Sequence, residues 1–188
     1  MKITRTRLPG AFIIEPRVFP DGRGYFFESY NRERFFLHGI RDEFVQDNVS
    51  FSVKDALRGL HYQSPHSQAK LVQVLSGEVF DVAVDIRAGS PFFGRWEGVI
   101  LSSENKRQFY IPAGFAHGFC VLSDTAVFSY KCDDFYAPDC EGGILWSDPG
   151  LGIDWPVKTP LLSEKDKAFP YLKDITRERL PVFRPPEA

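Results

Sequence analysis

The stretch VFDVAVDIR, residues 79–87, carries the clearest structural signal in the chain. Successive side chains of a β-strand point to opposite faces, so the alternation here divides the residues between two faces. One face would carry Phe80, Val82, Val84 and Ile86, and the other Val79, Asp81, Ala83 and Asp85. The stretch therefore predicts a strand with one packed face, while the acids of the other face point toward water or into a cavity.

Outward from this strand, the chain continues as short strand-like segments separated by turn residues such as Ser76-Gly77 and Ser123-Asp124. The other predicted strands cover residues 45–50, 57–63, 70–75, 94–101, 107–111, 118–122 and 126–131. Many short strands at this spacing are typical of a sandwich or a barrel, and no long helical pattern competes with them.

Helices are expected to be few and short. Asn31 can cap a helix over residues 32–37, and the pattern Ser-Glu-Lys-Asp at 163–166 is a capping box that begins another. The proline-rich segment from Thr176 is expected to pack loosely or fray. We therefore predict a single domain over residues 1–175 and a C-terminal tail over 176–188.

Length and composition limit the possible functions. With 188 residues the chain is about one domain long, and its net charge of −2 gives no basic field for nucleic acid or a membrane surface. No apolar run approaches the ~18 residues of a membrane span, and residues 1–5 lead into no signal-peptide core, so we expect a cytoplasmic protein. Cys120, Cys132 and Cys140 are expected to be reduced packing residues.

Candidate chemistry gathers in three segments that place polar side chains inside apolar strands. The segments are LRGLHYQ at 57–63, YIPAGFAHGF at 110–119 and FSYK at 128–131. Buried ionisable groups are unfavourable unless they are paired, and a fold that collects several of them usually uses them. His61 and His117, together with Arg58, Lys70 and Asp81, therefore indicate a functional site.

The pattern P-x-G-x-x-H at 112–117 resembles the second sequence motif of the cupins, which implies an all-β, cupin-like double-stranded jelly-roll barrel with a few short helices. In many cupins the first motif supplies His-x-His and a carboxylate that bind a metal with the later histidine. Here the corresponding residues are His61-Tyr62-Gln63, so the second imidazole is missing. A catalytic transition-metal site needs about three suitable protein ligands, so we expect no metal.

A closer resemblance covers roughly residues 1–172. The motifs that carry it are LRGLHYQ, KLV at 70–72, GEVFDVAVDIR at 77–87, IPAGFAHGF at 111–119 and LSEKD at 162–166. Together they resemble the dTDP-4-dehydrorhamnose 3,5-epimerase family. This resemblance implies an isomerase without metal or organic cofactor that inverts C3 and C5 of dTDP-4-keto-6-deoxyglucose, in dTDP-L-rhamnose biosynthesis. It also implies a homodimer in which N-terminal strands pair with the second subunit, so that Arg23 and Glu28 can enter the partner's site.

The resemblance assigns a role to each catalytic candidate. His61 matches the base that removes a proton beside the C4 ketone, and Asp166 matches the carboxylate that orients it. Tyr130 matches the acid that donates a proton to the opposite face of the sugar. Lys70 matches the cation beside the C4 oxygen, where it stabilises the charge of the enolate.

Further positions match substrate-binding residues of the family. Arg suits a pyrophosphate because its guanidinium makes bidentate, charge-assisted hydrogen bonds. Asp81 could hold either His117 or Lys70, and the sequence does not choose between them. The predicted binding residues are Arg23, Phe26, Glu28, Gln46, Asn48, Arg58, Asp81, His117, Tyr136, Glu141 and Lys165.

Three other functions remain open at this point. A single-site epimerase that acts at C3 or C5 alone would keep the same histidine and tyrosine. A metal-dependent cupin isomerase or oxygenase is disfavoured by the missing imidazole after Tyr62. A non-catalytic jelly roll that binds sugar nucleotides would not need the combination of His61, Lys70, Tyr130 and Asp166.

Overall fold

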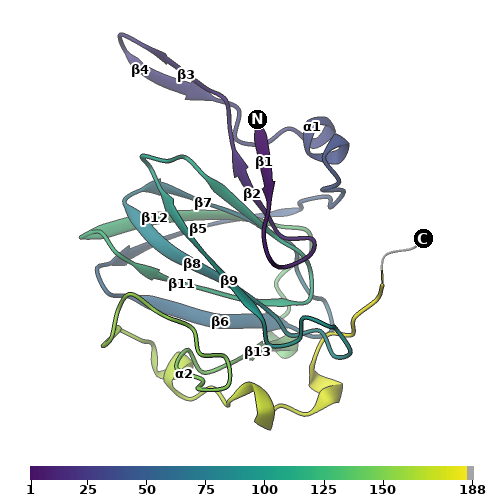
Figure 1. Ribbon diagram of the computed structural model, residues 1–188. Helices are drawn as coiled ribbons and strands as arrows, with labels where there is room; N and C mark the ends of the chain where they lie inside the picture. Colours follow the sequence, from purple (N-terminus) through teal and green to yellow (C-terminus); the bar gives the residue numbers. More distant parts are fainter. Residues whose placement is uncertain (186–188) are drawn as a thin grey trace.

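Two antiparallel sheets face each other around one interior in the computed structural model, which describes residues 1–185 (Figure 1). One sheet has the order β1 (Lys2–Arg5), β2 (Phe12–Glu15), β10 (Gln108–Ile111), β7 (Lys70–Ser76), β12 (Thr125–Cys132) and β5 (Gln46–Val53). The other has the order β13 (Glu141–Gly143), β6 (Leu57–Gln63), β11 (Phe115–Val121), β8 (Glu78–Asp85) and β9 (Trp96–Ser102). This arrangement confirms the predicted all-β jelly-roll barrel.

The main core lies between the two sheets. Phe119 of β11 stacks on Phe128 of β12 with ring centroids 4.2 Å apart, and the side chains of Val72 and Leu101 are fully buried beside them. These residues come from alternating positions of their strands, so the inward face of each sheet is apolar as the period of two requires.

A second core covers the outer face of the five-stranded sheet. Val82, Val84 and Ile86 pack there against residues of the C-terminal third of the chain, including Trp155 and Leu172. Strand β8 is therefore packed on both faces, and its Asp81 and Asp85 are fully buried, whereas Glu78 at its first position is exposed. Asp81 pairs with His117 and Asp85 with Arg87. The alternation predicted the packed face and left water or a cavity open for the acids; it could not choose between them, because the residues that pack around the strand come from distant parts of the sequence.

The helices are short, as expected. Helix α1 (Arg32–Leu37) begins after Asn31, whose side chain accepts a hydrogen bond from the Arg34 amide. Helix α2 (Glu164–Lys167) begins after Ser163, which caps it through the Asp166 amide. Single turns of 3₁₀ helix occur at Pro138–Cys140, Leu172–Asp174 and Arg177–Arg179.

The C-terminal segment is better packed than predicted. Leu180 and Pro181 are buried, and the Ala88 amide donates a hydrogen bond to the Pro181 carbonyl at 2.7 Å. The expectation of a loosely packed tail is therefore wrong for residues 180–183, because Ala88 offers them unpaired backbone groups at the end of the five-stranded sheet. Residues 186–188 of the predicted tail lie outside the described residues.

A hairpin of β3 (Val18–Asp21) and β4 (Gly24–Phe27) projects away from the barrel (Figure 1). Its aromatic side chains are exposed, with Phe26 at 69% of its full accessible area.

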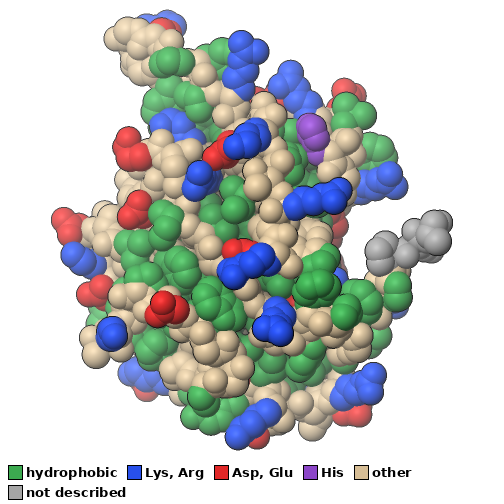
Figure 2. Space-filling model, viewed as in Figure 1, with side chains coloured by type: hydrophobic (Ala, Val, Ile, Leu, Met, Phe, Trp, Pro, Cys, Tyr) green, Lys and Arg blue, Asp and Glu red, His purple; other side chains and the backbone are tan. Residues whose placement is uncertain are grey.

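On the face shown in Figure 2, acidic and basic side chains are interspersed. Within residues 1–185, no helix is long and apolar enough to cross a membrane. Cys120, Cys132 and Cys140 are free thiols, as the sequence predicted.

Candidate active site

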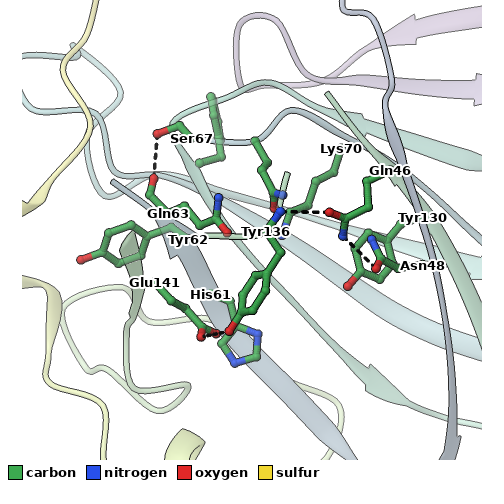
Figure 3. Close-up of a pocket in the computed structure, with 12 residues that line it drawn as sticks. Gln46, Asn48, His61, Tyr62, Gln63, Ser67, Lys70, Tyr130, Tyr136 and Glu141 are labelled. Atoms are coloured by element: carbon green, nitrogen blue, oxygen red, sulfur yellow. Dashed lines mark hydrogen bonds between the residues drawn. The ribbon is translucent and has the colours of Figure 1, made fainter. Parts of the chain in front are cut away.

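A pocket of about 220 Å³ lies between the two sheets (Figure 3). This volume is below the roughly 300–1,000 Å³ of pockets that enclose drug-sized ligands, so the pocket would hold only part of a nucleotide sugar. It brings together predicted residues from four distant parts of the sequence. The lining residues are Gln46, Asn48, His61, Tyr62, Gln63, Ser67, Gln68, Lys70, Phe115, Tyr130, Tyr136 and Glu141.

His61 and Asp166 form a tight pair on one side of the pocket. His61 Nε2 lies 2.6 Å from Asp166 Oδ1, and the Ser163 hydroxyl donates to Asp166 Oδ2 at 2.8 Å. Burial of the Asp166 carboxyl works to raise its pKa, but the hydrogen bonds from His61 and Ser163 outweigh burial and hold the pKa below its usual value. The carboxylate therefore stays ionised and fixes the orientation of the imidazole.

Tyr130 approaches the same pocket from the other sheet. It lies on β12 of the six-stranded sheet, whereas His61 lies on β6 of the five-stranded sheet. Burial raises the pKa of the Tyr130 phenol, an effect that the positive charge of Arg58 opposes. The phenol is thus protonated at neutral pH and available as a proton donor on the side facing His61 (Figure 3).

Lys70 begins β7 beside Tyr130. Its ammonium lies 5.7 Å from the centroid of the Tyr130 ring. Burial lowers the pKa of Lys70, while nearby Cys132, Asp81 and Glu141 act in the opposite direction. A cation in this position can stabilise a negative charge that develops on a bound ligand, and its effect is larger in a desolvated pocket than in water.

His117 and Asp81 form a second pair, deeper in the barrel. His117 Nε2 lies 2.9 Å from Asp81 Oδ2, and both side chains are almost completely buried. Burial works to raise the pKa of Asp81, and the attraction of His117 and Lys70 opposes it. The structure thus selects His117 as the hydrogen-bond partner of Asp81. Neither residue lines the pocket, so their contact with substrate stays a prediction.

The two barrel histidines are direct register partners, yet each is bound to its own carboxylate. Among residues 1–185, no group of three or more histidine, cysteine or acidic side chains is arranged to hold a metal ion. Independence from metal and cofactor nevertheless remains a prediction of the sequence.

A chain of hydrogen bonds follows the rim of the pocket (Figure 3). Gln46 donates to Asn48 at 3.0 Å and accepts from the Tyr136 amide at 2.9 Å. The Tyr136 hydroxyl donates to Glu141 at 2.8 Å, and Glu141 pairs with Lys165 at 2.5 Å. The rim is therefore tied to α2, the helix that also carries Asp166.

Besides Asp81, His117 and Lys165, four further predicted binding residues lie outside the lining of this pocket. Arg58 donates to the Ser52 hydroxyl at 2.9 Å, close enough to Tyr130 to affect its pKa. Arg23 pairs with Asp21 at the tip of the projecting hairpin, which also carries Phe26, and Glu28 pairs with Arg34 just beyond it. One chain does not bring Arg23, Phe26 or Glu28 to its own pocket, so their place in a partner's site stays a prediction.

The structure also adds lining residues that the sequence did not single out. Gln63 and Phe115 lie inside the motifs already described, where their positions on a strand could have indicated them. Ser67 and Gln68 lie on a loop without any local pattern. The Ser67 hydroxyl donates to the Gln63 carbonyl, and the Gln68 amide donates to the Asp134 carbonyl of another loop, each at 2.8 Å.

Comparisons with known proteins agree with this geometry. The family model described as dTDP-4-dehydrorhamnose 3,5-epimerase matches residues 5–174. The dTDP-4-dehydrorhamnose 3,5-epimerase of Shigella flexneri is 59% identical over 168 residues, which are 88% of this chain and 93% of that protein.

Solved structures extend the likeness to three dimensions. The chain is similar to a dTDP-6-deoxy-D-glucose-3,5-epimerase from Legionella pneumophila, in complex with dTDP-4-keto-L-rhamnose, with TM-score 0.95, 57% identity and coverage of 97% and 98% of the two chains. It is also similar to a 3'-monoepimerase from Streptomyces bikiniensis in complex with dTDP-quinovose, with TM-score 0.86, 39% identity and coverage of 94% and 91%. The extent of these matches shows that this chain belongs to the dTDP-4-dehydrorhamnose 3,5-epimerase family, whose members are epimerising isomerases.

Proposed function

We propose that this protein inverts both C3 and C5 of dTDP-4-keto-6-deoxyglucose by proton transfer. The observation that carries the proposal is the placement of His61 and Tyr130 on opposite sheets around one pocket. Inversion needs a base on one face of the sugar and an acid on the other, and this arrangement supplies both.

The chemistry starts at a carbon beside the C4 ketone, where removal of a proton gives an enolate. His61 accepts that proton, and Asp166 stabilises the resulting imidazolium through the 2.6 Å hydrogen bond. The Lys70 ammonium stabilises the negative charge on the C4 oxygen. Tyr130 then donates its proton to the opposite face of the same carbon, and exchange with water restores both groups.

The nucleotide would extend from the pocket along its rim. Polar side chains of Gln46, Asn48 and Glu141 line that side, and the Tyr136 ring offers a flat surface. Arg58 would bind a phosphate, which its proximity to Tyr130 supports. In the homodimer that we propose, the partner's hairpin brings Arg23, Phe26 and Glu28 to the nucleotide, which explains why an exposed aromatic hairpin projects from the chain.

A single-site epimerase is the second candidate. It is favoured by the likeness to the 3'-monoepimerase, which keeps the fold at 39% identity. The two functions differ in how many carbons exchange their proton with the solvent.

The test is incubation with dTDP-4-keto-6-deoxyglucose in deuterated water, followed by NMR of the product. We expect deuterium at both C3 and C5, each with inverted configuration. dTDP-glucose, which lacks the ketone, is the control and should take up no label. Deuterium at one carbon only would replace the double epimerase by the single-site enzyme, and no label at all would contradict both.

A further inference from the structure

Residues 180–183, here called the C-terminal strap, lie beyond the residues that the family model matches. The strap runs alongside Ala88, with a parallel bridge from Ala88 to Val182. Ala88 donates to the Pro181 carbonyl at 2.7 Å and accepts from the Phe183 amide at 3.1 Å. These bonds fix the strap at the end of β8 and place the Phe183 ring beside Arg87.

Two aromatic rings lie against the Arg87 guanidinium. Its guanidinium carbon lies 5.0 Å from the centroid of Phe183 and 4.5 Å from that of Phe115. The side chain is only 15% exposed and makes two hydrogen bonds to the fully buried Asp85, at 2.9 and 2.6 Å. A guanidinium stacks on aromatic faces and binds a carboxylate in its own plane at the same time.

The side chain of Arg87 is tightly packed against the backbone at Gly114 and against the strap. A Cβ atom on Gly114 would lie 2.7 Å from Arg87 Cγ and 3.4 Å from Pro181 Cβ, so the glycine allows the strap and Arg87 to come this close. Gly114 also adopts a positive φ of +90°, which favours glycine. The next residue is Phe115, which begins β11 and lines the pocket.

We infer that the C-terminal strap is a positioning element of the active site: Phe183 fixes Arg87, and Arg87 fixes the Phe115 ring in the pocket wall. This rests on the proposed function, because the wall matters only if a sugar reacts against it. Arg87 links Phe115 to the Phe183 ring of the strap, because its guanidinium contacts both rings. Loss of the Phe183 ring therefore frees the Arg87 side chain to tilt, and the Phe115 ring then moves with it. Phe183 and Arg87 act through Phe115 without touching the substrate.

The experiment compares single substitutions in the full chain. Phe183→Ala removes the ring, Phe183→Leu keeps an apolar side chain without an aromatic face, and Phe183→Trp keeps the face. Val182→Ala is the matched control, since Val182 is the adjacent residue and its side chain is 70% exposed. Each variant is measured for kcat and KM on dTDP-4-keto-6-deoxyglucose, for affinity for dTDP and for its unfolding midpoint.

We expect Phe183→Ala and Phe183→Leu to lower kcat about three- to tenfold, because a displaced wall misaligns the sugar against His61 and Tyr130. Affinity for dTDP should be unchanged, and Phe183→Trp and Val182→Ala should keep the original kcat. If Phe183→Ala does not fold, the comparison of Phe183→Leu with Phe183→Trp carries the test.

Equal kcat for Phe183→Leu and the unaltered protein would overturn the inference, since apolar packing alone would then suffice. A fall in kcat matched by an equal loss of dTDP-binding protein would also overturn it, because the strap would then only support folding. No turnover by the unaltered protein would instead contradict the proposed function itself.

Discussion

Asp166 uses its backbone to begin a helix and its side chain to bind His61 in the proposed reaction centre. Its backbone amide donates to the Ser163 hydroxyl and so begins α2, while its carboxylate holds His61. From the pattern at residues 163–166 alone, Asp166 could be read as a helix-capping residue, and the resemblance to the epimerase family added the catalytic role. The two interpretations are compatible because the helix cap fixes the backbone of Asp166 and leaves the carboxylate free to reach the imidazole.

Asp133 provides a test of stability at the residue scale. Its Oδ1 accepts a hydrogen bond from the Ala69 amide at 2.6 Å, next to Lys70. Burial, opposed by that amide and assisted by Asp42, raises the pKa of Asp133 to about 6. The folded state therefore binds this proton more tightly than the unfolded state, whose value is ~3.9. It follows that this group makes the free energy of unfolding fall as pH rises from about 4 to about 6.

Asp133→Asn keeps the acceptor but cannot ionise. We expect the variant to gain stability relative to the unaltered protein as pH rises through this window, and to keep the gain at neutral pH. Urea unfolding of both proteins at pH 4 and pH 7 measures the difference. A difference that does not change with pH would show that Asp133 has no raised pKa.

Individual side chains were predictable where they belong to a motif. His61, Lys70, Tyr130 and Asp166 were all named from the sequence, and the structure places the first three in one pocket, with Asp166 bound to His61. Ser67 and Gln68 were not, because contacts with Gln63 and with the loop at Asp134 hold them at the pocket, and no local pattern encodes such contacts.

At the scale of elements, the site depends on the pairing of β6 with β11. His61 lies opposite His117, and the register shifts before Phe119 pairs with Arg58. Gly59 and Gly118 meet at this irregularity, where a Cβ on Gly118 would lie 2.7 Å from the Arg58 carbonyl oxygen. The two glycines therefore let the strands approach at the point where both histidines are placed.

Gly118→Ala is expected to push β6 and β11 apart. Because the obstructing atoms are backbone, we expect a loss of about 1–3 kcal/mol in the free energy of unfolding, as for other overpacked interiors. Gly22→Ala is the matched control, since a Cβ there meets no atom within 4 Å and the residue has no positive φ. Urea unfolding measures both. Equal stability of the two variants would show that the close approach is not required.

Most strands were predictable because turn residues mark their ends, and 57–63 was predicted with its observed bounds. The environment of β8 was not. Its alternation indicated the packed face of Val82, Val84 and Ile86, but it could not show that the C-terminal third of the chain covers this face while Val79 and Ala83 join the main core, because long-range packing leaves no mark on a single strand.

At the scale of the whole molecule, each sheet contributes one side of the proposed reaction centre. Neither His61 on β6 nor Tyr130 on β12 could act on both faces of a sugar alone. The sequence predicted the barrel through its motifs, yet the docking of residues 180–183 was missed because its binding site at Ala88 exists only after the sheet has formed.

The projecting hairpin predicts a dimer. We expect sedimentation analysis to give twice the chain mass of 21.5 kDa. Phe26→Asp should shift the protein toward the monomer and weaken dTDP binding, since it places a charge on an exposed aromatic surface. Phe93→Asp, also at an exposed aromatic residue but on a loop of the barrel, is the control. A monomeric unaltered protein with full activity would contradict the proposed exchange of hairpins.

The most direct test of the account separates proton removal from inversion, using Tyr130→Phe in deuterated water. His61 can still remove and return a proton on its own face, so we predict deuterium in recovered substrate of unchanged configuration. Inversion should fall by about 10²-fold or more. His61→Ala should show neither exchange nor inversion while it still binds dTDP. Inversion by Tyr130→Phe at the rate of the unaltered protein would contradict the account.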